Sequence, residues 1–105
     1  MKFDELLAKV RETASKVDAS NMGFLAVQVN ITGKESGVFY VEVKDGKINV
    51  EPYEYNDRNC AITISLPDFV KLANGKLDPV FAFTTGKLKV DGDITKALEF
   101  SKLLK

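Results

Sequence analysis

The stretch LPDFVKLANGKLDPVFAFTTGKLKVDGD, residues 66–93, predicts two short helices by the order of its prolines and glycines. Pro67 suits the first turn of a helix, and Gly75 supplies the left-handed residue that closes one. Asp78 is a favourable N-cap with Pro79 behind it, and Gly86 ends the second helix. We expect a positive φ at Gly86, where helix gives way to strand.

The same stretch carries more hydrophobic side chains than two short surface helices can hide on one face. They are Phe69, Val70, Leu72, Val80, Phe81, Ala82 and Phe83. These side chains need a sheet, a bound ligand or both to cover them. A surplus of this kind indicates a cavity or a subunit interface, and periodicity alone is equally compatible with a plain packed core.

Alternating hydrophobic residues around this stretch predict five strands. Their expected ranges are 25–31, 38–44, 47–53, 60–66 and 86–91. The dipeptide Asp45-Gly46 predicts a tight hairpin, because both central residues of such a turn take positive φ. A hydrophobic stripe predicts an amphipathic helix over 3–17, and Asp93 begins a final helix. The order indicates one α+β domain, residues 1–105, with a five-stranded, mainly antiparallel sheet and helices on one face.

The pattern D-F-x-x-L-x-x-G-K-L-x-P-x-x-A-F-x-x-G-K-L-K-x-x-G-D at residues 68–93 resembles the sterol carrier protein type 2 family. The resemblance extends over almost the whole chain, but the first helix is similar only in a generic way. It implies a stand-alone member of the family, whose helices and sheet enclose a hydrophobic tunnel. Members of the family accept sterols, fatty acids and fatty acyl-coenzyme A, so the resemblance implies a lipid or acyl ligand.

We expect the ligand to lie against the short helices, the last strand and the final helix. The predicted ligand-binding residues are Phe69, Leu72, Val80, Phe81, Phe83, Val90, Leu98 and Leu103. The second short helix and the final helix are expected to form a movable wall, since glycines bound both segments. A polar rim could meet a carboxylate or hydroxyl head group, and the sequence leaves its members open among Gln28, Asn21, Lys16 and Lys87.

Little in the composition supports catalysis. The chain has no histidine, the side chain most often used as a general base near neutral pH. Cys60, the single cysteine, lies in an apolar strand pattern typical of a packed thiol. Asp91 and Asp93 suit a turn and a helix cap better than a metal, because further ligands are missing. We predict no catalytic residue, no metal site and no cofactor.

Charge and hydropathy restrict the partners. Lys and Arg total 15 and Asp and Glu total 15, so no net field attracts nucleic acid. No hydrophobic run approaches the roughly 20 residues of a membrane helix, and the N-terminus lacks the order of a signal peptide. With one cysteine, these features predict a cytoplasmic protein that has no nucleic-acid partner and no transmembrane segment.

The favoured hypothesis is non-enzymatic binding and intracellular transfer of a fatty acid, fatty acyl-coenzyme A or sterol-like ligand in a hydrophobic cavity. The alternative is an accessory interaction subunit or homodimer that serves an isoprenoid-quinone or other lipid pathway. Transient membrane contact and a homodimer are both left open.

Overall fold

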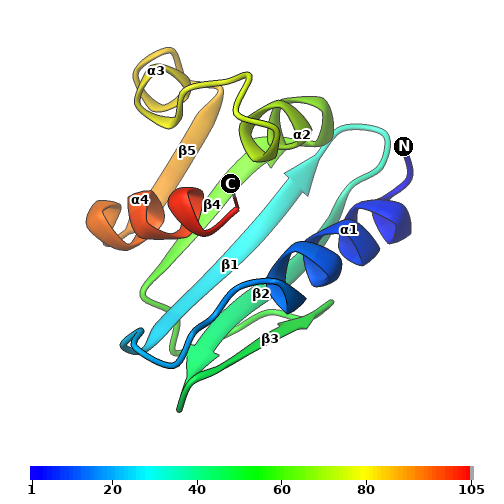
Figure 1. Ribbon diagram of the computed structural model, residues 1–105. Coiled ribbons are helices and arrows are strands. Elements are labelled where there is room, and N and C mark those ends of the chain that lie inside the picture. Colours follow the sequence, from blue (N-terminus) through cyan, green and yellow to red (C-terminus); the bar gives the residue numbers. More distant parts are fainter. Residues whose placement is uncertain (105) are drawn as a thin grey trace.

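The computed structural model describes residues 1–104 and is built on a five-stranded sheet with the spatial order β3-β2-β1-β4-β5 (Figure 1). The strands are β1 (Leu25–Thr32), β2 (Gly37–Lys44), β3 (Lys47–Glu51), β4 (Cys60–Ser65) and β5 (Leu88–Gly92). Neighbouring strands are antiparallel except β1 and β4, which run parallel. The predicted α+β class with a mainly antiparallel sheet is confirmed.

Two strand boundaries differ from the predicted ones by two residues, and the others agree within one residue. The third strand ends at Glu51 instead of Tyr53, because Pro52 has no N–H group to donate to a ladder. The fifth strand begins at Leu88 instead of Gly86 and continues to Gly92, which pairs with Cys60 of β4. The predicted hairpin between β2 and β3 is confirmed, with φ angles of 52° at Asp45 and 75° at Gly46.

Four helices cover one face of the sheet (Figure 1). They are α1 (Phe3–Ser15), α2 (Leu66–Ala73), α3 (Pro79–Thr84) and α4 (Ile94–Leu103). The last three begin at side chains that accept hydrogen bonds from the first turn: Ser65, Asp78 and Asp93. Each helix makes its most extensive contacts with a strand, α1 with β3, α2 with β4, α3 with β5, and α4 with β1 and β4. The helical layer is thus held mainly by the sheet.

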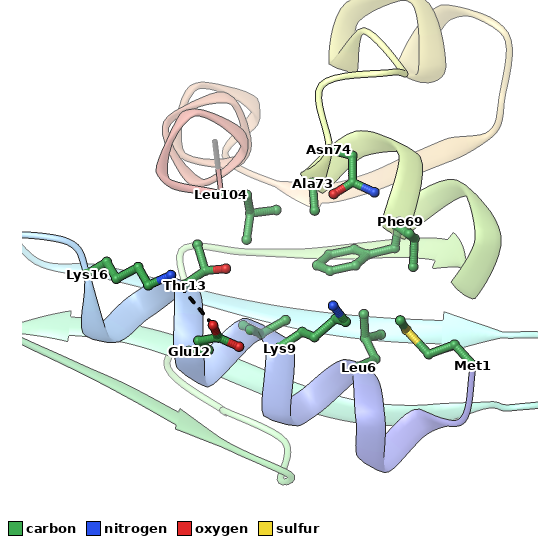
Figure 2. Close-up of a pocket in the computed structure, with 12 residues that line it drawn as sticks. Met1, Leu6, Lys9, Glu12, Thr13, Lys16, Phe69, Ala73, Asn74 and Leu104 are labelled. Carbon is green, nitrogen blue, oxygen red and sulfur yellow. Dashed lines mark ion pairs between the residues drawn. The ribbon is translucent and has the colours of Figure 1, made fainter.

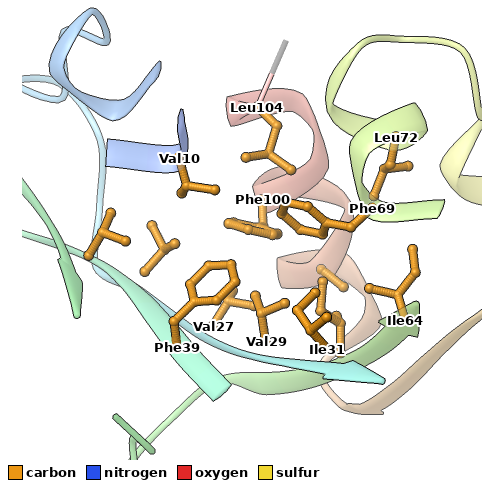
Figure 3. Close-up of a cluster of buried hydrophobic side chains, with 14 of the residues drawn as sticks. Val10, Val27, Val29, Ile31, Phe39, Ile64, Phe69, Leu72, Phe100 and Leu104 are labelled. Carbon is orange, nitrogen blue, oxygen red and sulfur yellow. The ribbon is translucent and has the colours of Figure 1, made fainter. Parts of the chain in front are cut away.

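The core lies between the helices and the inner face of the sheet (Figure 3). Alternate residues of β1, such as Val27 and Val29, face the helices and are fully buried. Three rings connect elements that are distant in sequence. The ring centroid of Phe39 in β2 lies 6.2 Å from that of Phe3 in α1. It lies 5.9 Å from the ring centroid of Phe69 in α2, and these two rings meet edge to face. Such pairs add to the free energy gained from burial alone.

The loop over residues 52–59 crosses the outer face of the sheet and is fixed there by hydrogen bonds. The Tyr55 backbone N–H donates to the buried Gln28 side chain at 3.0 Å, and the Tyr55 hydroxyl donates to Glu42 at 2.6 Å. The latter bond lowers the pKa of Glu42, and it raises the pKa of Tyr55 to about 12 because it holds the phenol in its protonated form. The polar side chains on the outer face are therefore hydrogen-bonded to the loop that covers them.

Gly86→Val is expected to lower the free energy of unfolding by about 1 to 3 kcal/mol through backbone strain. Gly86 has φ +82°, which confirms the expected positive angle, and a Cβ added there meets no atom within 4 Å. Gly86→Asn is the matched control, because Asn tolerates the left-handed region better than a β-branched residue. Urea unfolding measures both losses. An Asn variant as unstable as the Val variant would contradict the strain argument.

Cys60→Ser is expected to lower the free energy of unfolding by about 1 to 3 kcal/mol, because the hydroxyl would replace a thiol in an apolar environment. The side chain is 1% exposed. Burial, together with the negative charge of Asp93, raises the pKa of the Cys60 thiol from its ordinary value of 9.0 to about 11. The stabilisation given by the neutral thiol is therefore complete below pH 9 and is lost as the pH rises toward 11.

The measurement is urea unfolding of both proteins between pH 7 and pH 11. The native thiol should also react with a disulfide reagent at pH 8 far more slowly than the unfolded thiol. A native Cys60 that reacts as fast as the unfolded one would show that the thiol is not the packed group described above.

Candidate functional site

One opening in the helical layer lies between α1, α2 and the end of α4 and has a volume of about 270 Å³ (Figure 2). We call it the α1–α2 pocket. Its apolar lining residues are Met1, Leu6, Val10, Phe69, Val70, Ala73 and Leu104. Its polar lining residues are Lys9, Glu12, Thr13, Lys16 and Asn74. The pocket therefore has a hydrophobic floor and a rim that can form hydrogen bonds.

Helical spacing places both kinds of residue. Leu6 and Val10 are four apart, so they share the face of α1 that points at the sheet. Lys9 and Thr13 are also four apart and lie on the adjoining side, toward α2. Figure 2 shows Lys9 and Asn74, the C-cap of α2, projecting toward the opening from its two sides. The rim is thus formed by the edges of two helices.

The two lysines of the rim differ in charge pairing. Lys16 lies 3.5 Å from Glu12 in an exposed ion pair. Among residues 1–104, Lys9 has no ion-pair partner. A free ammonium beside an apolar floor can attract an anionic group that belongs to a hydrophobic molecule.

A second opening lies between α3, β5 and α4 and has a volume of about 140 Å³. We call it the α3–α4 pocket. All its lining side chains are hydrophobic: Pro79, Val80, Phe83, Leu88, Val90, Ile94, Ala97 and Leu98. It can therefore accept hydrocarbon and offers no side-chain hydrogen bond.

The two pockets are separated by the inner face of α4. Ala97 lines the α3–α4 pocket, Leu104 lines the α1–α2 pocket, and Phe100 lies between them on the same face. The Phe100 side chain is 1% exposed and packs in the core near Phe69 (Figure 3). With a rise of about 1.5 Å per residue, Ala97 and Leu104 are roughly 10 Å apart along the helix. The buried Phe100 ring thus lies between the two openings along α4.

The structure brings half of the predicted ligand-binding residues together, since Val80, Phe83, Val90 and Leu98 line the α3–α4 pocket. The other four lie elsewhere: Phe69 in the floor of the α1–α2 pocket, Leu72 in the core, Leu103 half-buried beside Met22, and Phe81 exposed to 54%. Successive residues of a helix are about 100° apart, so Phe81 and Phe83 point in nearly opposite directions.

The head-group candidates are also separated. Lys16 lies on the rim of the α1–α2 pocket. Gln28, another of the four candidates, does not reach the rim, because it lies on the outer face and bonds with Asn30 and Tyr55. The alternation of Gln28 with the buried Val27 and Val29 was the signal that placed it opposite the helices.

Sequence reasoning missed the part that α1 plays. Leu6, Lys9 and Val10 line a pocket, although the sequence predicted α1 only as an amphipathic helix. Its stripe showed which side faces inward, but the neighbour that completes the pocket, α2, lies about 60 residues away. No local signal indicated that pairing.

The α3–α4 pocket has no ionisable side chain in its lining, and the ionisable side chains of the α1–α2 pocket are Lys9, Glu12 and Lys16. The Cys60 thiol is buried with a raised pKa. Within residues 1–104, no three His, Cys, Asp or Glu side chains are grouped so as to hold a metal ion. In the same part of the chain, no helix combines the length and hydrophobicity needed to span a bilayer. A cytoplasmic location stays a prediction.

The model of the SCP-2 sterol transfer family matches residues 3–105. Hydroxysteroid dehydrogenase-like protein 2 of Xenopus tropicalis is 36% identical over 103 residues, which cover 97% of this chain and 24% of the relative. Sterol carrier protein 2 of Homo sapiens is 32% identical over 102 residues, which cover 96% of this chain and 19% of the relative. The chain thus spans less than a quarter of the length of these relatives.

Solved structures share the fold. Sterol carrier protein 2 from Yarrowia lipolytica, in its apo form, gives a TM-score of 0.76 at 21% identity and covers 95% of this chain and 87% of that one. Sterol carrier protein 2 from Aedes aegypti, in complex with palmitate, gives a TM-score of 0.71 at 19% identity and covers 99% of this chain and 94% of that one. Since the family model covers nearly the whole chain, this protein belongs to the SCP-2 sterol transfer family.

Proposed function

We propose that this chain is a non-enzymatic carrier that holds one linear acyl ligand between the helices and the inner face of the sheet. The acyl chain lies on Phe69 and the neighbouring apolar floor, and its head group lies at the rim formed by α1 and α2. The observation that carries the proposal is the α1–α2 pocket, in which Lys9, without an ion-pair partner among residues 1–104, stands beside hydrophobic side chains. The palmitate complex of the Aedes aegypti relative supports the same class of ligand.

The size of the openings sets a condition on binding. Pockets for small molecules usually have about 300 to 1,000 Å³, whereas the α1–α2 pocket has about 270 Å³. A long acyl chain therefore requires the core to open. The Phe100 ring is the group to be displaced, because its movement joins the α1–α2 pocket to the α3–α4 pocket under α4. This places the end of the hydrocarbon chain beside Phe83 and Val90.

The energetics favour such a rearrangement. Burial of hydrocarbon contributes roughly 0.8 kcal/mol per methylene, so a chain of about 16 carbons gains on the order of 10 kcal/mol before ordering costs. Displacing one ring from a well-packed site costs about 3 to 5 kcal/mol at most, the loss seen when Phe is truncated to Ala. The hydrocarbon that enters also refills the space. The net balance therefore favours the bound form for long chains and disfavours it for short ones.

Palmitate is expected to raise the melting temperature of the protein by about 10 °C or more at a hundredfold excess over Kd, equivalent to about 2.7 kcal/mol. Phe83→Ala should reduce that increment, because Phe83 lines the α3–α4 pocket. It should also lower the ligand-free stability by about 1 to 2 kcal/mol, less than for a fully buried ring. Differential scanning calorimetry with and without palmitate measures both quantities.

Phe81→Ala is the matched control for this measurement. It removes the same ring from the opposite side of the same helix, where 54% of the side chain is exposed. The palmitate increment should be unchanged in this variant. If no acyl or sterol ligand shifts the melting temperature of the unmodified protein, the carrier proposal fails. If Phe83→Ala and Phe81→Ala reduced the palmitate increment equally, the acyl chain would not lie beside Phe83.

Lys9→Ala is expected to weaken palmitate binding by about three- to fivefold, the size of an exposed charge pair. It should leave the binding of hexadecanol, which has no carboxylate, unchanged. Lys47→Ala provides the charge-matched control, because Lys47 is an exposed residue of the β2–β3 hairpin. Isothermal titration calorimetry gives the dissociation constants. Equal losses for palmitate and hexadecanol would show that Lys9 contributes packing and does not recognise the carboxylate.

A further inference from the structure

One edge of the sheet is open, because β3 pairs with β2 on one side and, among residues 1–104, with no strand on the other (Figure 1). The two-residue turn before β3 makes Lys44 and Lys47 a hydrogen-bonded pair, and such pairs alternate with non-bonded ones along an antiparallel ladder. The backbone N–H and C=O groups of Ile48 and Val50 therefore point away from β2. They form the open edge.

Within residues 1–104, one of these four backbone groups has a hydrogen-bond partner. The Val50 carbonyl accepts a bond from the Arg11 Nε at 3.1 Å, which agrees with an outward direction of the Val50 backbone. Arg11 also lies 3.6 Å from Glu51, in an ion pair whose side chains are about half exposed. The Ile48 N–H, the Ile48 C=O and the Val50 N–H are left without a partner in that part of the chain. A row of such groups is a template for an added strand.

An open groove of about 510 Å³ runs beside this edge, between β3 and the second half of α1. We call it the β3 groove. Its apolar lining residues include Ala14, Val17, Ala19, Ile48 and Val50, and its polar ones include Arg11, Ser15, Lys47, Asn49 and Glu51. The alanines leave room for larger side chains, which an added strand would direct toward the helices at alternate positions. The edge thus has an apolar surface beside its unpaired backbone groups.

The sequence of β3 is complementary to itself. It has a base at its start, Lys47, an acid at its end, Glu51, and the hydrophobic Ile48 and Val50 between them. When two copies pair antiparallel about a two-fold axis at Asn49, Lys47 of each copy faces Glu51 of the other. Ile48 faces Val50 on the helix side, and their edge groups can bond to each other. A shift of the register by two residues would lose both charge pairs.

We propose that a second copy of this chain pairs with β3 in this register, so that two sheets become one across a two-fold axis. Residues 44–51 hold two lysines and two acids, so the copies do not repel each other. Arg11 gives up its bond to the Val50 carbonyl and keeps Glu51. The other edge strand, β5, ends at Gly92, a residue type that weakens strand pairing.

The proposed dimer is weak and forms only at high protein concentration. Two paired strands of five residues bury less than the roughly 800 Å² per partner of a standard interface, so we expect a dissociation constant on the order of 0.1 mM. The α1–α2 pocket uses residues of α1 other than those that line the β3 groove. The pairing therefore does not rest on the proposed carrier function and can be tested without a ligand.

Asn49→Cys places a thiol at the proposed two-fold axis. Opposite residues of a non-bonded pair have Cα atoms about 4.5 Å apart, within the range of a disulfide. Mild oxidation should therefore link the two copies. Lys47→Cys is the matched control on the same face of β3, because its two copies lie roughly 13 Å apart along the strands. It should not link to itself, but it should link to Glu51→Cys when the two variants are mixed. The buried Cys60 is common to all three.

Sedimentation equilibrium measures the dissociation constant of the dimer. Lys47→Glu should raise it about tenfold or more, because two pairs of like charges then face each other. Glu51→Lys should do the same, and an equal mixture of these two variants should restore association by forming a mixed dimer. Lys34→Glu makes the same charge change in the exposed β1–β2 loop and should alter the constant less than twofold.

Amide hydrogen exchange tests the backbone pairing itself. The N–H groups of Ile48 and Val50 should exchange more slowly as the protein concentration rises, whereas the Asn49 N–H, which bonds to β2, should be protected at every concentration. A protein that stays monomeric at about 1 mM, ten times the expected dissociation constant, overturns the proposal and leaves the edge to an extended segment of another protein. A dimer that Lys47→Glu leaves intact also overturns it, because its interface lies elsewhere. The melting temperature of each variant shows that it is folded.

Discussion

The parallel pairing of β1 with β4 is the constraint on which the rest of this structure depends. β3 lies at one edge of the sheet, so the chain must cross β2 and β1 to reach the position of β4. It crosses on the outer face, where the Asn59 side chain accepts a hydrogen bond from the Ala26 N–H at 2.7 Å and Tyr55 bonds to Gln28 and Glu42. Because the crossing loop occupies that face, the helices cover the other one.

The openings in the helical layer follow from the way the helices are held. Each helix packs chiefly on a strand, so no tight helix–helix seam closes the space between α1 and α2 or between α3 and α4. A seam would require matched ridges and grooves on facing helices. Here the inner residues of α4, Ala97 and Phe100, point at the sheet instead. Rotation of one ring can therefore change the enclosed space while the strand contacts that hold the helix persist.

The sequence correctly predicted the features that depend on the backbone conformation of a few neighbouring residues. Asp45-Gly46 and Gly86 were correctly placed, because positive φ restricts a position to few residue types. The parallel register of β1 against β4 and the proximity of α1 to α2 were not predictable, since both join segments distant in sequence. For the site, the surplus hydrophobic side chains were counted, but the direction in which each one points from its helix was not considered. The helical angle between Phe81 and Phe83 already separates an outward ring from one that lines a pocket.

Composition is a weak guide to the partners of this chain. Lysines and aspartates balance overall, and they also balance within residues 68–93, which contain four of each. Charge therefore does not distinguish α3 from the rest of the surface. The uncovered apolar side chains of α3 do distinguish it, since Val80, Phe81 and Phe83 are exposed, and Val80 and Phe83 also line a wholly hydrophobic pocket. A single exposed phenylalanine is unremarkable at a protein surface, so the information lies in the spatial arrangement of these side chains around the pocket.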